Sequence, residues 1–169
     1  MSTDGSRTEA WKSIALGEQA AVYAYGVLTA QFPDGPERSR AIDLGVTHAR
    51  DRDRARAALA EQSVEPDSPA AFEIPFPMTG PASARRLAAV VESRLVDVYC
   101  AAVGQLEGKE RRRAAASAAA CSARSVRWGA RPTAFPGEAE VELVASATPD
   151  PTGSAASGSV SPDDGASVG

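Results

Sequence analysis

The sequence predicts an all-α protein, a bundle of four helices arranged as two antiparallel hairpins, and three observations support this fold class. Apolar residues between Trp11 and Tyr25 recur every three or four positions, which is the period of one buried helical face. Alanine is abundant and only 5% of the residues are aromatic, which favours helices that approach each other closely. Proline and glycine divide these residues into four segments, as expected for one helical domain.

The first hairpin is predicted from helices over residues 8–31 and 36–62. The sequence FPDGP ends the first helix, and its Asp, Gly and Pro residues provide the turn and the start of the second helix. Because the turn is short, we expect the two helices to lie side by side and to run antiparallel.

One charged residue, Glu18, lies on the buried face of the first predicted helix. The other residues of that face are apolar or aromatic and occur at helical spacing: Trp11, Ile14, Val22 and Tyr25. A buried carboxylate is stable only when it is paired. We therefore expect Glu18 either to hold a ligand or to be held by other side chains.

A long segment without helical character, residues 63–80, separates the two hairpins. It contains four prolines in eighteen residues, which excludes a helix and disfavours a central strand. Extended at ~3.3 Å per residue it reaches roughly 60 Å, whereas a helix of about 25 residues is ~37 Å long, so it can cross the whole bundle. Two hairpins joined by one long crossover form a ferritin-like arrangement. Alternate residues of the crossover are apolar and should lie against the bundle: Phe72, Ile74, Phe76 and Met78.

The second hairpin is predicted from helices over residues 81–108 and 109–130. A glycine-proline pair precedes the first of these helices, and Pro132 prevents the second from continuing. Cys100 and Cys121 are offset by ~9 Å along the helix axes. Because a disulfide requires Cα atoms within about 7 Å, we expect two free thiols.

The two ends of the chain differ from the bundle in composition. We expect residues 1–7 to be flexible, residues 8–137 to form the bundle, and residues 138–169 to be disordered. This last part is rich in Ser, Gly and Pro and has six acidic residues and no basic one. No run of about eighteen apolar residues indicates a membrane span, and the N-terminus lacks the apolar core of a signal peptide. The sequence therefore predicts a cytoplasmic protein that does not bind membranes.

Four stretches of sequence carry a resemblance to a known family: ALGEQAAVYAYGVL, THARDRDRARAAL, AFEIPFPMTGPASARRLA and RWGARPTAFPG. Through them, residues 10–137 resemble the uncharacterised actinobacterial ferritin-like family called domain of unknown function 4439. The resemblance implies a four-helix ferritin-like bundle and implies no established activity.

The sequence contains only part of a ferritin-like di-iron site. Such a site requires one Glu from each of two helices and a Glu-x-x-His motif from each of the other two. Glu18, His48 and Glu92 match members of this set. Gly45 stands where an acid should precede His48, and the fourth helix has no acid or histidine beyond its first turn. His48 is also the only histidine, so a di-iron centre with two histidines and four carboxylates cannot be assembled.

Arginines stand where the fourth helix would supply metal ligands. Arg124 and Arg127 lie on one face, and their guanidinium groups stay protonated and bind carboxylates at two points. In an antiparallel hairpin, residues that are equally far from the turn lie at the same level. This places Glu18 beside His48 in the first hairpin and Glu92 beside Arg124 in the second. We predict that one or both arginines supply the positive charge that a metal supplies in functional relatives. The predicted buried polar cluster, a degenerate metal site, consists of Glu18, His48, Arg52, Glu92, Arg124 and Arg127.

Three classes of function remain open. The absence of a catalytic motif favours a non-catalytic structural or interaction module without a cofactor, bound to an unknown protein partner or to a second copy as a homodimer. The alternative is a metal-dependent oxidoreductase with iron or another single divalent metal at Glu18, His48 and Glu92. A third class is an RNA-associated protein that uses the basic fourth helix, with KERRR at residues 109–113. The scarcity of aromatic residues for base stacking argues against nucleic acid.

Overall fold

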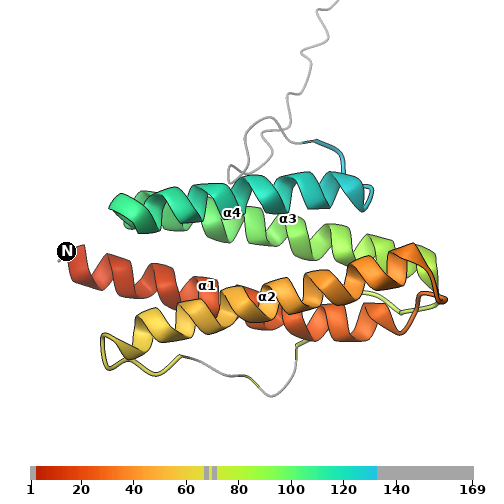
Figure 1. Ribbon diagram of the computed structural model, residues 1–169, viewed down its shortest axis with the longest axis horizontal. Helices are drawn as coiled ribbons and strands as arrows, with labels where there is room; N and C mark the ends of the chain where they lie inside the picture. The colour runs from red at the N-terminus through yellow and green to blue at the C-terminus, as the bar shows by residue number, and fades with distance from the viewer. Residues whose placement is uncertain (1–2, 67–68, 70–71, 133–169) are drawn as a thin grey trace, which may run out of the picture. The chain divides into compact units, whose positions relative to one another are not determined.

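Four α-helices make up most of the part of the chain that the computed structural model describes, residues 3–66, 69 and 72–132 (Figure 1). Their bounds are α1 Thr3–Thr29, α2 Pro36–Ala60, α3 Pro81–Gln105 and α4 Gly108–Arg127. The two hairpins are α1 with α2 and α3 with α4, and in each the helices run antiparallel. This confirms the predicted all-α four-helix fold.

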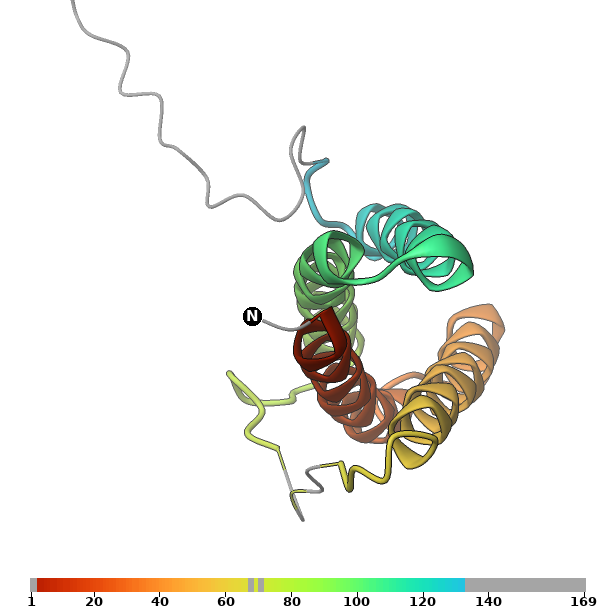
Figure 2. The same ribbon diagram turned by 90° about the vertical axis from the view of Figure 1, so that its left-hand side faces the viewer.

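The helices lie in the spatial order α2, α1, α3, α4 (Figure 2). Helix α1 packs against both α2 and α3, and α3 packs against α4. Helices α2 and α4 do not pack directly against each other within the described residues. The bundle therefore has two inner helices, α1 and α3, and two outer helices, α2 and α4.

The inner helices bury most of the large apolar side chains. Fully buried examples on α1 and α3 are Ile14, Leu28, Leu87 and Leu95, whereas α4 buries only Ala114, Ala118, Cys121 and Ser125. The inner helices also approach each other closely at Gly17. A Cβ atom at this position would lie 3.2 Å from Leu95 Cδ2, so a larger residue would push against α3.

The two glycine-proline pairs explain why α2 and α3 begin where the sequence predicts. Gly35 and Gly80 adopt φ angles of 151° and 129°, which glycine enters readily and other residues avoid. Pro36 and Pro81 then occupy the first helical turn, where the missing N–H group costs no helical hydrogen bond. Each pair therefore fixes the start of one helix.

The crossover packs one side against the inner helices, as its alternating pattern predicts. Its apolar residues are half-buried and the residues between them are exposed. The Phe72 ring lies 5.9 Å from the ring of Tyr23 on α1. The Arg86 guanidinium of α3 lies 4.3 Å from the centre of the Phe76 ring, a cation–π contact. Side chains on both inner helices thus hold the crossover in place.

Helix α1 begins five residues earlier than predicted, at Thr3 instead of Thr8. Arg7 gives the physical reason, since it donates hydrogen bonds of 2.9 and 2.6 Å to the Glu110 carboxylate of α4. This contact joins residues 103 apart, so local sequence patterns cannot reveal it. Each helix also ends two or three residues before its predicted end. Residues 1–2 and 133–169, which include the expected disordered tail, lie outside the described residues.

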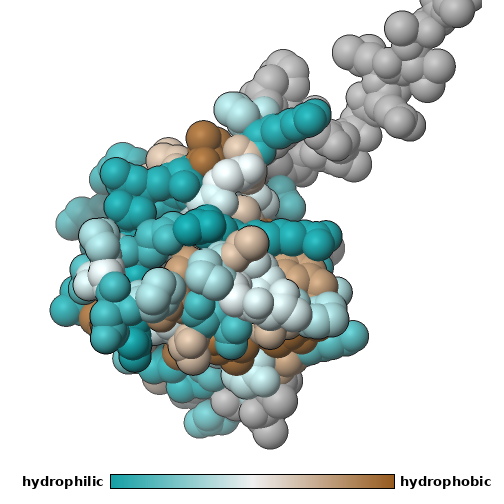
Figure 3. Space-filling model, turned by 90° about the vertical axis from the view of Figure 1, so that its right-hand side faces the viewer, coloured by the Kyte–Doolittle hydropathy of each residue, from teal (hydrophilic) through white to brown (hydrophobic). Residues whose placement is uncertain are grey.

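Polar side chains cover much of the bundle surface. None of the described helices is long and apolar enough to cross a lipid bilayer. The view onto the end where α1 turns into α2 shows hydrophilic residues with smaller apolar patches between them (Figure 3). Large apolar side chains that are exposed in the described residues are Leu16, Ile42, Val46 and Val126. Scattered exposure of this kind is ordinary for a folded protein.

Candidate functional site

Each helix contributes one charged side chain to the centre of the bundle. These residues, which we call the charged quartet, are Glu18 of α1, His48 of α2, Glu92 of α3 and Arg124 of α4. Glu18, His48 and Glu92 are at most 1% exposed, whereas the Arg124 side chain is 21% exposed. The quartet therefore places ionisable groups from four separate helices inside apolar surroundings.

His48 lies between the two glutamates. Its Nδ1 atom is 2.7 Å from Glu18 Oε2, and its Nε2 atom is 3.3 Å from Glu92 Oε1. Arg124 Nε donates a hydrogen bond of 2.8 Å to the same oxygen of Glu92. These contacts form one continuous chain of side chains that joins all four helices.

Two buried tyrosines extend the hydrogen bonding of the glutamates. Tyr25 of α1 donates to Glu92 Oε1 at 2.8 Å, and Tyr99 of α3 donates to Glu18 Oε1 at 2.5 Å. In both inner helices the tyrosine follows the glutamate by seven residues, which puts the pair on one helical face. The arrangement is reciprocal, because each glutamate accepts from the tyrosine of the other inner helix. Trp128 Nε1 in turn donates to the Tyr25 hydroxyl at 3.1 Å.

His48 is positively charged at neutral pH. Burial alone favours its neutral form and lowers its pKa, but hydrogen bonds to Glu18 and Glu92 and their negative charge outweigh burial and raise the pKa to about 9. Both ring nitrogens then carry a proton to donate. Burial raises the pKa of Glu92, yet the hydrogen bond to His48 and the charges of His48 and Arg124 bring this pKa below its ordinary value. Two positive and two negative charges thus balance within the quartet.

Arg124 also contacts a buried thiol. Burial opposes the charged form of Arg124, but its hydrogen bond to Glu92 raises its pKa, so the guanidinium stays cationic. Its Nη2 atom lies 3.1 Å from Cys121 Sγ as a hydrogen-bond donor. Burial raises the pKa of the Cys121 thiol, which keeps it protonated and unreactive. Cys121 and Cys100 are both free, as their spacing predicts.

Four of the six residues predicted for the polar cluster meet in the quartet, and two do not. Arg52 donates to Asp53 at 2.8 Å and to Gln19 at 3.5 Å, and its side chain is 19% exposed. Arg127 is exposed to solvent. Three residues along a helix rotate the side-chain direction by about 300°, which is enough to move Arg127 off the narrow buried stripe of α4.

The tyrosine and tryptophan partners are not among the residues predicted for the polar cluster. Tyr25 lies on the predicted buried face but has no predicted partner, and neither Tyr99 nor Trp128 is predicted to lie at the site. The available signal is the repeated spacing Glu-x6-Tyr, which occurs once in each inner helix. A shared spacing on two helices that pack together indicates that the same pair of groups meets twice.

The donor set of the quartet does not fit a di-iron centre. A metal ligand needs a free lone pair, and both nitrogens of His48 are engaged with carboxylates. Arg124 brings a cation into direct contact with Glu92, a candidate ligand. Glu92 Oε2 is buried without a hydrogen-bond partner in the described residues, but one free oxygen is too few ligands for an ion. Across the described ranges, no group of three or more His, Cys, Asp or Glu residues is placed to hold a metal.

The fold has counterparts among known proteins. The profile of a family described as a domain of unknown function, DUF4439, matches residues 10–140. The crystal structure of a conserved hypothetical protein, Rv2844, from Mycobacterium tuberculosis is similar, with a TM-score of 0.70 and 26% sequence identity. That similarity covers 80% of this chain and 100% of the other. A comparison with curated proteins finds no match.

Proposed function

Since the chain belongs to the family described as domain of unknown function DUF4439, we propose that it is a non-catalytic, ferritin-like bundle that acts as a structural or interaction module. The charged quartet is the observation that carries this proposal. In it, His48 and Arg124 supply the positive charge that metal ions supply in catalytic ferritin-like proteins. The centre of the bundle then holds the helices together and performs no chemistry.

The electrostatics of the quartet support this role. Two carboxylates buried at the centre of a bundle raise the free energy of the folded state unless cations compensate them. His48 provides that compensation, since its Nδ1 atom lies 2.7 Å from Glu18 Oε2 and its Nε2 atom lies 3.3 Å from Glu92 Oε1. Buried groups that are paired in this way can fix the register of the helices that carry them, because any shift of a helix leaves a charge unpaired.

Elemental analysis of the full-length protein tests the proposal. Protein produced in iron-supplemented medium, then incubated with Fe²⁺, Mn²⁺ or Zn²⁺ and passed through a desalting column, is expected to retain far less than one ion per chain. Retention of two irons per chain would contradict it. One ion per chain would favour the alternative, a metal-dependent oxidoreductase with a single metal at Glu18, His48 and Glu92.

A matched pair of variants makes this test sharper. Arg124→Glu exchanges the cation of α4 for a metal ligand, so three carboxylates then surround one imidazole. We expect this variant to unfold more easily than the wild type in the presence of a chelator and to be stabilised by added Mn²⁺ or Zn²⁺. Arg127→Glu, three residues away on the exposed side of α4, is the control and should not respond to metal. An equal response of both variants would contradict the assigned role of Arg124.

The interaction part of the proposal concerns the outer face of α4, where several alanines are exposed: Ala115, Ala116, Ala119, Ala120 and Ala123. Small side chains let another helix approach closely, so we infer that a protein partner or a second copy packs there, in the cytoplasm. Sedimentation velocity at increasing concentration tests self-association. If the protein forms a homodimer through this face, the substitution Ala119→Glu should dissociate it. A wild-type protein that stays monomeric at all concentrations would contradict the proposal that a second copy packs there.

A second candidate function rests on the cationic side chains of α4. Lys109, Arg112 and Arg113 are exposed and form no salt bridge with any described residue. An RNA-associated protein would bind a single-stranded RNA probe with an affinity that falls steeply with salt, because bound counterions are released. Fluorescence anisotropy of the wild type and of the triple variant Arg111→Gln, Arg112→Gln, Arg113→Gln distinguishes this function. Equal binding by both proteins would exclude the basic helix as the RNA site.

A further inference from the structure

A cavity of about 400 Å³ lies between the inner helices and the crossover, and no residue of the charged quartet lines it. Helix α1 forms one wall with Tyr23 and several small residues, and α3 forms the other mostly with branched apolar residues. The crossover covers the cavity with Phe72, Glu73, Ile74 and Pro75. An apolar cavity of this size is within the range of small-molecule binding sites.

The cavity arises because α1 presents small residues where the crossover passes over it. Gly17 and Ala20 leave space that larger side chains fill elsewhere in the core. Gly17 also permits the close approach of α1 to α3, since a Cβ there would lie 3.2 Å from Leu95 Cδ2. Opposite these residues, Val91 and Val98 of α3 add apolar surface. The walls therefore suit an alkyl chain better than a polar group.

The covering segment is held by side chains. Residues 72–78 form no backbone-to-backbone hydrogen bond with other described residues. Their contacts include the Phe72 ring against Tyr23 and the Phe76 ring under Arg86. A ligand can enter by displacing a few such contacts, without breaking a ladder of hydrogen bonds.

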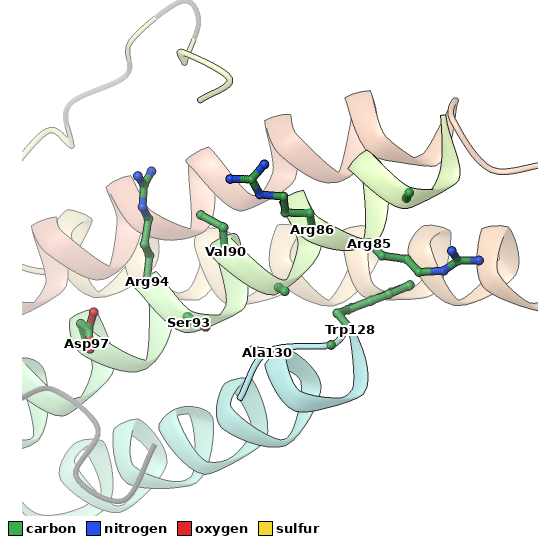
Figure 4. Close-up of a pocket in the computed structure, with 11 residues that line it drawn as sticks. Arg85, Arg86, Val90, Ser93, Arg94, Asp97, Trp128 and Ala130 are labelled. Atoms are coloured by element: carbon green, nitrogen blue, oxygen red, sulfur yellow. The ribbon is translucent and has the colours of Figure 1, made fainter. Parts of the chain in front are cut away.

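One unpaired cation, Arg94, borders the cavity. Two other arginines of α3 are engaged: Arg85 donates to Glu37 at 2.6 and 2.7 Å, and Arg86 lies over a ring of the crossover. Arg94 is exposed and forms no salt bridge within the described part of the chain. Figure 4, which draws a neighbouring cavity that shares Arg94, shows its guanidinium directed to the same side of α3 as that of Arg86 and away from Asp97.

We propose that this cavity binds an aliphatic monocarboxylate of medium chain length, with the alkyl chain between α1 and α3 and the carboxylate on Arg94. A volume of about 400 Å³ accommodates about a dozen non-hydrogen atoms at ~30 Å³ each, the size of a ten-carbon acid. A guanidinium binds a carboxylate at two points. Glu73 also borders the cavity, and its negative charge repels a ligand with two negative charges more strongly than a ligand with one. This inference goes beyond the proposed function and does not depend on the quartet.

Isothermal titration of the full-length protein with three probes tests the ligand class. Decanoate has both the chain and the charge, decanol has the chain alone, and acetate has the charge alone. We expect one decanoate per chain, roughly tenfold weaker binding of decanol, and no detectable binding of acetate. Failure of decanoate to bind at millimolar concentration, or equal affinity for decanoate and decanol, would overturn the proposal.

Three variants locate the site. Arg94→Gln should weaken decanoate binding roughly tenfold and leave decanol unchanged. Arg112→Gln removes an exposed arginine of α4 and is the matched control, expected to bind like the wild type. Ala20→Leu fills the cavity and should abolish binding of both probes, with circular dichroism confirming that its helices are intact. Equal weakening by Arg94→Gln and Arg112→Gln would show general charge attraction and contradict the site. None of these results alters the metal analysis, so the two proposals fail separately.

Discussion

The inner and outer helices are held in the bundle by different kinds of contact. The inner helices bury large apolar side chains, whereas the buried residues of the outer helices are few and mostly small: Ala41, His48, Ala55 and Leu59 on α2, and Ala114, Ala118, Cys121 and Ser125 on α4. Hydrophobic stabilisation grows with the apolar area buried, so alanines contribute little of it. Each outer helix instead adds one cation, His48 or Arg124, that contacts a glutamate of an inner helix.

This difference indicates which contacts hold each helix in its position. The inner pair should tolerate changes in the polar network as long as their apolar contacts persist. The outer pair has fewer apolar contacts, so its position depends more on charge and hydrogen bonding. Substitutions that affect the two kinds of contact separately test this difference.

The largest effect is expected for His48→Gln, which removes the cation between Glu18 and Glu92. Loss of one partner from a buried ion pair leaves an uncompensated charge, so the free energy of unfolding should fall by about 3–5 kcal/mol. Urea denaturation followed by circular dichroism measures this change. Arg52→Gln, also on α2 but outside the quartet, is the control and should cost less than about 1 kcal/mol. Similar losses in the two variants would mean that the quartet does not position α2.

The dependence of stability on pH is expected to be the next largest effect. The pKa of His48 rises from 6.5 in the unfolded chain to about 9 in the folded protein, so its contribution is complete below pH 6.5 and is lost as the pH rises through 9. The free energy of unfolding should fall by up to about 3 kcal/mol over this interval. Denaturation at a series of pH values tests this, and the same slope in His48→Gln would assign the effect to another group.

A smaller loss is expected when a tyrosine of an inner helix is truncated. Tyr99→Phe removes the hydrogen bond to Glu18 and should lower the free energy of unfolding by about 2 kcal/mol, typical of a bond to a charged group. Tyr23→Phe changes a tyrosine of α1 that contacts the crossover and serves as the control. Thermal or urea denaturation compares the two, and a neutral Tyr99→Phe would remove this residue from the network.

The smallest effect is expected at the ion pair that joins the start of α1 to α4. Arg7→Ala should change the global free energy of unfolding by less than about 1 kcal/mol, since both side chains are about one third exposed and solvent screens their attraction. Its main effect should be local fraying. Faster hydrogen exchange confined to the amides of residues 7–11, which donate to the carbonyls of the first turn, would agree with this, whereas unchanged exchange would show that Arg7 does not hold the first turn of α1.

Much of the fold follows from short sequence signals. Gly35 with Pro36 and Gly80 with Pro81 set the starts of two helices through backbone geometry alone, which is why these starts are predictable. The start of α1 is not predictable in this way, because it depends on a contact between Arg7 and α4.

The candidate site is predictable only in part. Short turns fix which residues of a hairpin lie at the same level, and this reasoning brings Glu18 to His48. It cannot decide how far each side chain is rotated around its helix, so Arg52 and Arg127 are placed wrongly at the centre. The tyrosine partners come from the other hairpin, and no turn relates the two hairpins.

The reciprocal tyrosine bonds have a consequence for how the chain reaches its native state. Glu18 belongs to the first hairpin and accepts from Tyr99 of the second, while Glu92 of the second accepts from Tyr25 of the first. Neither half can complete the hydrogen bonding of its own acid, and a desolvated carboxylate that lacks a donor is costly. The halves should therefore assemble in a single cooperative event, and fragments separated at the crossover should regain helical structure only when they are mixed.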